Sequence, residues 1–219
     1  MGSLFYYNES KLREETAGYL KIPSVFKTSV RLYRKGGLPG HYYIDFDMIT
    51  NDPYRCDELA KYFAFRILGL SKKQPVELLG FIEKYGVGTF GAVRLAGFIS
   101  HLTNIPNVLI RLTRELEYEQ VKLPPIEGKT PRERLAGTRM IIITDHISTG
   151  KELLEAVDAV EFNGGRVTDV ISYTMRMDIV KKEEFTQRGI QLHTLFELPN
   201  DLPDNLKAIA LGIVQKSAH

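Results

Sequence analysis

One stretch of the chain places an acid, two hydroxyl side chains and a glycine directly after an apolar run. It reads Met140-Ile-Ile-Ile-Thr-Asp-His-Ile-Ser-Thr-Gly-Lys-Glu152. The apolar residues 140–143 predict a strand buried on both faces. Thr149 and Glu152 have the Thr-x-x-Glu spacing of a capping box, which predicts a helix starting at Thr149. Amides at a helix N-terminus favour a phosphate, and Gly150 lets the backbone approach it closely.

Asp145 follows the predicted strand, at the end where open parallel sheets bind ligands. A carboxylate repels a phosphate but accepts hydrogen bonds from sugar hydroxyls. The segment therefore predicts a site for a phosphorylated sugar. The alternative is a strand, turn and capped helix with no ligand, which every α/β domain contains. His146 is expected to be a simple loop residue.

The rest of the chain alternates strand-like and helix-like segments. Apolar runs predict strands at 77–82, 107–110, 140–143, 167–173 and 190–195. Helical spacing predicts helices over 54–70 and 92–102, from 149 to about 160, and over 178–188. This alternation predicts an α/β fold: a twisted, mostly parallel sheet with helices on both faces.

The first 55 residues do not follow this alternation. They hold a short helical pattern at 12–19 and a stretch rich in Gly and Tyr over 31–47. We therefore expect two parts, a small N-terminal unit over 1–55 and an α/β core over 56–219. Residues 113–138 are charged and aperiodic, and loops of that length are usually functional. Apolar residues near 206–213 suggest a closing helix.

The composition excludes several classes of protein. A length of 219 residues fits one domain with an appendage, and a net charge of +2 gives no reason to expect nucleic acid binding. The single cysteine, Cys56, excludes a disulfide framework. The histidines His41, His101 and His193 are too scattered for a metal site. The absence of a long apolar run or a leader pattern predicts a cytoplasmic protein that does not enter membranes.

The segment around Asp145 resembles the phosphoribosyl-pyrophosphate (PRPP) motif of the type I phosphoribosyltransferases. That motif is an apolar strand, two acids, two variable residues and then Thr/Ser-Thr-Gly. Thr144 falls on the first acid and Asp145 on the second, His146 and Ile147 take the variable places, and Ser148, Thr149 and Gly150 form the turn. The resemblance implies that these residues, with Lys151, bind the ribose hydroxyls and the 5′-phosphate.

Other segments narrow the resemblance to orotate phosphoribosyltransferase. Gly40–Phe46 is similar to its N-terminal hood strand, which implies that Tyr42 and Tyr43 flank the base, with Lys27 and Arg31 nearby as base-binding cations. Residues 86–91 resemble the loop that holds pyrophosphate, and they include Gly88, Thr89, Phe90 and Gly91. Residues 106–111 resemble the strand entering the mobile catalytic loop, where Arg111 and Arg114 would contact pyrophosphate and, with Asp145, carry catalysis.

The sequence departs from the family at three functional positions. Thr144 stands where the family has an acid, Phe90 where the orotate enzyme has a lysine, and Arg114 near the place of a loop lysine. The leading hypothesis is transfer of a phosphoribosyl group between PRPP and orotate or a similar planar base, with release of pyrophosphate. Mg²⁺ would arrive with PRPP rather than through direct protein ligands, and the mobile loop implies a homodimer.

Two alternatives remain open. One is a catalytically weak or inactive regulator on the same fold that binds PRPP or a nucleotide. The other is a purine-type phosphoribosyltransferase.

Overall fold

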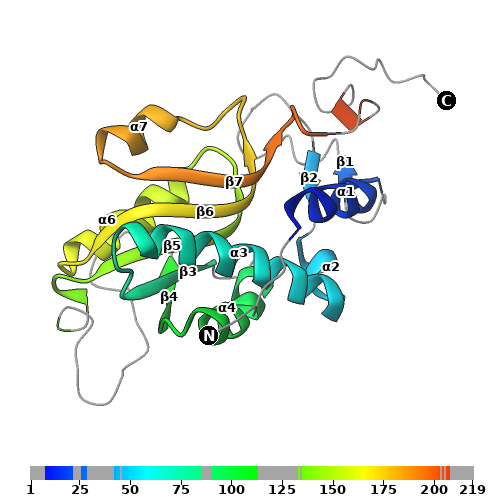
Figure 1. Cartoon of the computed structure of the whole chain (residues 1–219). Helices are drawn as coiled ribbons and strands as arrows, with labels where there is room; N and C mark the ends of the chain where they lie inside the picture. The colour runs from blue at the N-terminus through cyan, green and yellow to red at the C-terminus, as the bar shows by residue number, and fades with distance from the viewer. Residues whose placement is uncertain are drawn as a thin grey trace.

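A computed structural model describes most of the chain (Figure 1). The described residues are 8–21, 26–28, 42–44, 46–84, 90–112, 133, 135–202, 204 and 206–207. For residues 16, 19–20, 26–28, 42–43, 83–84, 90–93 and 111–112 the description covers the backbone only.

The elements follow one another in an α/β order after a short N-terminal part. That part contains α1 (Glu9–Leu20), β1 (Phe26–Thr28), β2 (Tyr42–Ile44) and α2 (Phe46–Thr50). The remainder contains α3 (Pro53–Lys73), β3 (Leu78–Lys84), α4 (Phe90–Thr103), β4 (Asn107–Leu112), β5 (Arg139–Ile147), α6 (Lys151–Phe162), β6 (Arg166–Arg176), α7 (Lys182–Gln187) and β7 (Gln191–Leu198).

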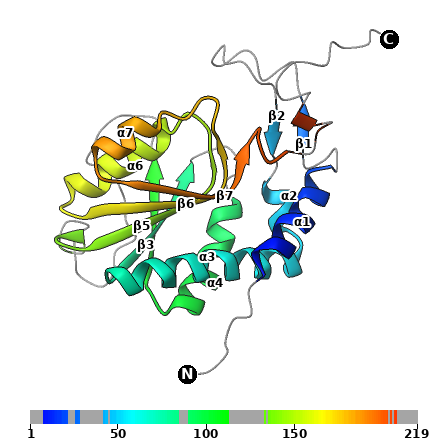
Figure 2. The same cartoon turned by 45° about the horizontal axis from the view of Figure 1, so that its top comes forward.

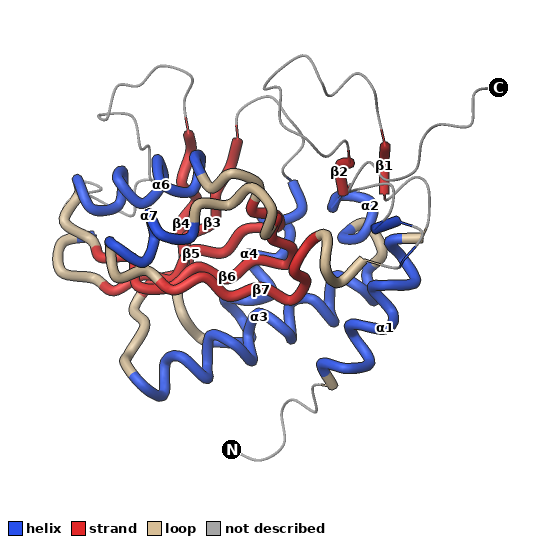
Figure 3. Tube along the Cα trace, turned by 90° about the horizontal axis from the view of Figure 1, so that it is seen from above, coloured by secondary structure: helices blue, strands red, loops and turns tan. Residues whose placement is uncertain are grey.

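The main sheet has five parallel strands in the order β4-β3-β5-β6-β7 (Figures 1 and 2). Parallel neighbours need crossover connections, and α4, α6 and α7 lie on the connections between successive strands. Figure 3 shows α6 and α7 on one side of the sheet and α3 and α4 on the other. The α/β fold with helices on both faces is therefore confirmed.

Each face of the sheet has its own hydrophobic cluster. The cluster under α3 and α4 includes Tyr62, Phe63, Phe81, Ile143 and Tyr173. The cluster under α6 and α7 includes Met140, Ile142, Val157, Val170 and Phe185. Ile142 and Ile143 are neighbours in β5 and belong to different clusters, because successive side chains of a strand point to opposite faces.

The long helix α3 has sequence signals at both ends. Asp52 is its N-cap, and the Asp52 carboxylate accepts a hydrogen bond of 3.0 Å from the Tyr54 amide. Pro53 occupies the first turn, where a missing N–H costs nothing, and Lys72 and Lys73 lie at the negative end of the helix dipole. These signals determine where α3 begins and where it ends.

The N-terminal elements share a core with the sheet. The strands β1 and β2 pair in antiparallel fashion, with Lys27 opposite Tyr43. Ile44, Phe46 and Leu12 are buried in the α3–α4 cluster, and the ring of Phe46 lies 5.2 Å from that of Tyr173 in β6. The division into parts at residue 55 stays a prediction, since α2 and α3 bury side chains in the same cluster.

A buried polar network joins the amino-terminal ends of β5, β6 and β7. The Arg139 guanidinium donates to Asp169 and to Thr168, each at 2.8 Å, and His193 Nε2 lies 2.9 Å from the other Asp169 oxygen. Burial acts to raise the pKa of Asp169, but hydrogen bonds from His193 and Thr168 and nearby positive charge outweigh it, so this pKa is lowered. The network ties three strands together at the end of the sheet opposite to Asp145.

Most predicted elements match the observed ones to within a few residues. Two predictions were wrong in extent. The helix predicted over 178–188 is reduced to α7 (Lys182–Gln187), because Asp178 bonds back to Arg176 and residues 177–179 form a turn. The predicted strand 140–143 continues to Ile147, as the next section describes. For the predicted closing helix, Leu206 is buried, and residues 208–219 lie outside the described part of the chain.

Candidate functional site

The sheet topology places the ends of two strands, β3 and β5, side by side. From β3 the chain crosses to β4 on one side, and from β5 it crosses to β6 on the other. The carboxyl ends of β3 and β5 are therefore adjacent at the point where the winding direction changes. Open α/β sheets bind ligands in the crevice at such a switch point. The segment after Lys84 and the segment after Ile147 both start there.

The end of β5 is a polar continuation of an apolar strand. Beyond Ile143, where the pairing with β3 ends, β5 stays paired with β6. Thr144 lies opposite Ser172, and His146 lies opposite Thr174. The prediction that His146 belongs to a loop was wrong, because hydroxyl side chains on β6 provide polar partners that let the strand continue.

Asp145 presents a partly buried carboxylate at this strand end. Its Oδ1 accepts hydrogen bonds from the His146 amide at 2.7 Å and from the Thr144 hydroxyl at 3.4 Å. Oδ2 takes no hydrogen bond from another residue within the described ranges. Burial raises the pKa of Asp145 to about 6, hydrogen bonds from His146 and Thr144 oppose the rise, and the charge of Asp47 in α2 adds to it. A carboxylate held at a cost in free energy marks a candidate functional group.

Thr144 lies where the family motif has its first acid. Its side chain is buried, and its hydroxyl points to Asp145 Oδ1 rather than adding a charge beside it. The strand end therefore carries one carboxylate instead of two.

His146 is held inside the sheet in its neutral form. Its Nδ1 lies 2.8 Å from the Thr174 hydroxyl oxygen. The pKa of His146 is lowered to about 4. Burial is the main cause, the charge of Arg176 acts in the same direction, and the charge of Asp178 opposes both. The His146 ring therefore carries no positive charge at neutral pH, and it does not neutralise the neighbouring Asp145 carboxylate.

The turn after β5 differs from the predicted capping box. The N-cap of α6 is Gly150, with φ of 85°, and no side chain caps the helix. Thr149 accepts only a long contact of 3.4 Å, from the Lys151 amide. The predicted box was wrong because the chain turns at a left-handed position that glycine adopts without strain. The helix therefore starts at Lys151, directly after a glycine N-cap, and a helix N-terminus of this kind can receive an anion.

Two structural features of Gly150 account for the residue type. A Cβ at this position would lie 2.8 and 2.9 Å from two ring carbons of Phe185. Phe185 itself is fully buried in the α6–α7 cluster. The Phe185 ring, which belongs to α7, therefore packs directly against the turn that precedes α6. Lys151, next in the chain, is exposed and lies 3.9 Å from Glu155.

Arg176 is a site residue that the sequence analysis missed. It closes β6, beside the end of β5, and is 5% exposed. Its guanidinium bonds to both carboxylate oxygens of Asp178, one of them at 3.1 Å. The available signal was a lone arginine after the uncharged run 170–175, at the carboxyl end of a predicted strand.

A second ion pair, Arg94 with Asp47, includes the acid whose charge acts on Asp145. Arg94 of α4 contacts Asp47 at 3.7 Å and the Thr50 hydroxyl at 3.3 Å. These contacts tie α2 to the helix that follows the β3 loop.

Several predicted residues are placed by their backbone alone or not at all. Lys27, Tyr42 and Tyr43 lie in the β1–β2 hairpin, Phe90 and Gly91 open α4, and Arg111 lies near the carboxyl end of β4. Gly88, Thr89, Arg31 and Arg114 fall outside the described residues. The contiguous set from Thr144 to Lys151 is therefore the part of the predicted site whose geometry can be given.

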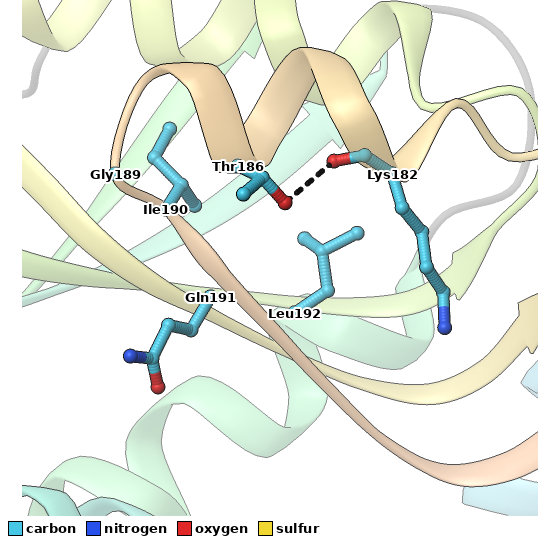
Figure 4. A pocket seen from close by; sticks show the side chains of 6 residues that line it. All are labelled: Lys182, Thr186, Gly189, Ile190, Gln191 and Leu192. Carbon is cyan, nitrogen blue, oxygen red and sulfur yellow. Dashed lines mark hydrogen bonds between the residues drawn. The ribbon is translucent and has the colours of Figure 1, made fainter.

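A pocket of about 390 Å³ lies elsewhere, between α7 and β7 (Figure 4). Its lining is Lys182, Thr186, Gly189, Ile190, Gln191 and Leu192. Gln191 begins β7 and lies opposite Asp169, so this pocket is near the amino-terminal end of the sheet. It is separate from the carboxyl end where Asp145 lies.

Two kinds of feature are absent from the described ranges. Within those ranges, no helix combines the length and the apolar character needed to cross a bilayer. No group of three or more His, Cys, Asp or Glu side chains suited to a metal ion occurs in the same part of the chain.

The chain is similar in sequence to orotate phosphoribosyltransferases. It is 29% identical over 128 residues to that of Rhodopseudomonas palustris (strain BisB5), covering 58% of this chain and 65% of the relative, which is less than two thirds of its length. It is 26% identical over 191 residues to that of Methanothermobacter thermautotrophicus, covering 87% and 94%. A hypoxanthine/guanine phosphoribosyltransferase of Methanopyrus kandleri is 24% identical over 167 residues, covering 74% and 86%. No family model matches.

Solved structures share the fold. Leishmania donovani UMP synthase has a TM-score of 0.64 and 19% identity, covering 93% of this chain and 42% of the other. Orotate phosphoribosyltransferase of Aeropyrum pernix has a TM-score of 0.62 and 16% identity, covering 91% and 99%. Adenine phosphoribosyltransferase of Leishmania donovani has a TM-score of 0.61 and 16% identity, covering 91% and 85%. The chain therefore has the type I phosphoribosyltransferase fold and is a sequence relative of orotate phosphoribosyltransferases.

Proposed function

We propose that the protein transfers a phosphoribosyl group between PRPP and a planar base of the orotate type, with release of pyrophosphate. The observation that supports this most is the pairing of Asp145 with the start of α6. The Asp145 carboxylate, whose Oδ2 takes no hydrogen bond from another residue in the described ranges, lies five residues before Gly150, the glycine N-cap of α6. The carboxylate suits the ribose hydroxyls, and the helix amides suit the 5′-phosphate.

The unfavourable free energy of the ionised Asp145 carboxylate in the folded protein supports a functional role for this residue. A buried carboxylate with a raised pKa destabilises the folded state at neutral pH. Asp145 receives two hydrogen bonds from adjacent residues and, among the residues that the structure describes, lies near a second acid, Asp47, rather than beside a compensating cation. A sugar that donates hydroxyl hydrogens to Oδ2 would supply the missing partners. Binding would then favour the ionised form of Asp145.

Departure of pyrophosphate requires positive charge on the leaving group's side. The transition state builds negative charge on pyrophosphate and positive charge on the ribose. We assign the first role to Arg111 and Arg114, and we assign pyrophosphate contacts to the loop that contains Gly88 and Thr89. The ionised Asp145 lies on the ribose side. Mg²⁺ would be held mainly by PRPP oxygens, since hard oxygen ligands suit it, and it would neutralise charge on the leaving group.

The base would lie between the hood and the sheet. Tyr42 and Tyr43, with Lys27 and Arg31, remain our proposal for the base-contacting residues of the hairpin. By the family resemblance we also propose a homodimer in the cytoplasm, in which the loop over 113–138 reaches the partner's site.

Binding of PRPP tests the sugar site. Titration of the protein with PRPP and Mg²⁺ should give a saturable heat signal and a stability gain of roughly 2.7 kcal/mol at 100 times Kd. Asp145→Asn keeps the shape and removes the charge, so we expect affinity to fall by roughly tenfold or more. Glu183→Gln, an exposed carboxylate in α7, is the matched control. Equal affinity in both variants would refute the assignment of Asp145.

Turnover separates the two remaining functions. Release of pyrophosphate in the presence of orotate, hypoxanthine, guanine or adenine identifies an enzyme and its base class, and the purine relative makes the purine arm necessary. PRPP binding without pyrophosphate release from any base would instead favour a regulator that has kept the site. Thr144 and Phe90, which replace an acid and a lysine of the family pattern, favour that second function.

A further inference from the structure

A closed set of hydrogen bonds joins β5 and β6 beside the candidate site. The His146 amide donates to Asp145 Oδ1 at 2.7 Å. The His146 ring Nδ1 lies 2.8 Å from the Thr174 hydroxyl oxygen, and that hydroxyl lies 3.4 Å from the main-chain carbonyl oxygen of Asp145. We call Asp145, His146 and Thr174 the strand-end network.

The network assigns the proton of His146. A carbonyl oxygen can only accept, so the single hydroxyl hydrogen of Thr174 is directed to Asp145, and the hydroxyl oxygen accepts from Nδ1–H. The lone pair then lies on Nε2, which has no hydrogen-bond partner in the described part of the chain. Burial and the charge of Arg176 both keep the pKa of His146 low, so at neutral pH the ring is uncharged and carries a single N–H.

Both halves of one peptide group are fixed by the network. The Thr174 hydroxyl makes a long contact of 3.4 Å with the carbonyl of the peptide between Asp145 and His146, and Asp145 Oδ1 accepts a hydrogen bond of 2.7 Å from the N–H of that peptide. The rotation of the Asp145 side chain is therefore tied to the orientation of this peptide. A carboxylate tied through Oδ1 keeps Oδ2 in a defined direction. Misplacing a binding group by about 1 Å can cost as much as 10² in rate.

We propose that His146 and Thr174 are positioning residues that orient the Asp145 carboxylate toward the hydroxyls of the bound ribose. This proposal rests on the proposed function; it gives a positioning role to His146, which the resemblance counts among the ligand contacts, and to Thr174, which it does not. In the family resemblance His146 takes a variable place, so the role belongs to this chain. Charged groups near the network are Arg176 and Asp178 on the β6 side and Asp47 from α2.

Substitution of Thr174 tests the proposal. Thr174→Val keeps the shape and removes the hydroxyl, and we expect it to weaken PRPP binding by roughly tenfold. Thr174→Ser keeps the hydroxyl and should restore most of the affinity. Ser172→Ala is the matched control, because Ser172 is a buried hydroxyl two residues earlier in β6 that bonds to the His193 carbonyl instead. Its PRPP affinity should equal that of the wild type.

A double variant separates positioning from general damage. Because Thr174 acts through Asp145, the variant Asp145→Asn with Thr174→Val should bind PRPP no more weakly than Asp145→Asn alone. Additive losses would overturn the proposal, as would a Thr174→Val affinity equal to that of Ser172→Ala. Urea unfolding of each variant identifies any loss of affinity that follows from loss of the fold.

The tautomer of His146 provides a readout without ligand. ¹⁵N NMR of the imidazole should show a protonated Nδ1 that does not titrate between pH 5.5 and 8, and Thr174→Val should lose this state. A protonated Nε2 in the wild type would overturn the positioning role, whatever the outcome with PRPP. If the wild type shows the expected tautomer and binds no PRPP, the proposed function fails while the network itself stands.

Discussion

Gly150→Ala should cost more stability than any other alanine substitution at a comparable left-handed glycine. Gly150 has φ of 85°, and an added Cβ would meet Phe185 ring carbons at 2.8 and 2.9 Å, closer than real Cβ atoms come to their neighbours. The left-handed conformation costs a non-glycine residue about 1–2 kcal/mol. Overpacking against a fully buried ring adds about 1–3 kcal/mol. The sum is about 2–5 kcal/mol.

Gly189→Ala is the matched control for this estimate. Gly189 has φ of 71°, and an added Cβ there would meet no heavy atom within 4 Å. It should therefore lose only the conformational part, about 1–2 kcal/mol. The difference between the two variants isolates the contact with Phe185.

Urea unfolding followed by circular dichroism measures both variants, with equal m-values as the condition for comparing them. Phe185→Leu in the Gly150→Ala background should recover part of the contact energy, which appears as a favourable coupling between neighbouring sites. Equal losses in Gly150→Ala and Gly189→Ala would refute the packing argument. PRPP affinity should also fall in Gly150→Ala, because the alanine displaces the start of α6.

Three further predictions concern charge. Asp145→Asn should stabilise the protein at pH 8 by at most about 3 kcal/mol and much less at pH 4. A carboxyl pKa raised from 3.8 to about 6 gives stability that is lost as pH rises through 6, and the asparagine has no such loss. Urea unfolding at the two pH values measures this effect, and an equal difference at both would contradict it. Arg139→Met should cost about 3–5 kcal/mol by leaving Asp169 buried without its cation, measured by urea unfolding. Asp169→Asn should flatten the acid side of the stability curve, because a lowered carboxyl pKa gives stability that is lost as pH falls below 3.8.

Periodicity predicted the sheet well because each strand buries apolar residues on both faces. Residues 140–143 form the centre of β5, and the helix over 54–70 is found within α3. These elements are specified locally, by side-chain spacing and by end signals such as Asp52 and Pro53. Local signals do not give the order of strands in the sheet. That order brings the ends of β3 and β5 together and so creates the candidate site.

Prediction from the sequence was wrong where a polar residue is buried beside a partner that is distant in the chain. The strand seemed to end at Ile143 because Thr144 and His146 are polar, yet Ser172 and Thr174 lie opposite them in β6. A hydropathy pattern records the polarity of a side chain and not the hydrogen bond that satisfies it. The same limit hid Arg139 and Asp169, which are 30 positions apart in the chain and bonded at 2.8 Å.

The capping box failed for a different physical reason, and the failure bears on function. Thr149 and Glu152 have the right types and spacing, but a Thr cap at position 149 would require Gly150 to begin the helix with right-handed dihedral angles. Gly150 instead adopts φ of 85° under the ring of Phe185. The helix lacks the predicted capping box, a feature worth about 1 kcal/mol, and its Lys151 amide makes a long contact of 3.4 Å with the Thr149 hydroxyl instead. A turn that omits an available cap, beside a carboxylate held at raised pKa, gives up stability at two neighbouring places. Under the proposed function, one ligand that brings a phosphate and a diol together would offset both costs.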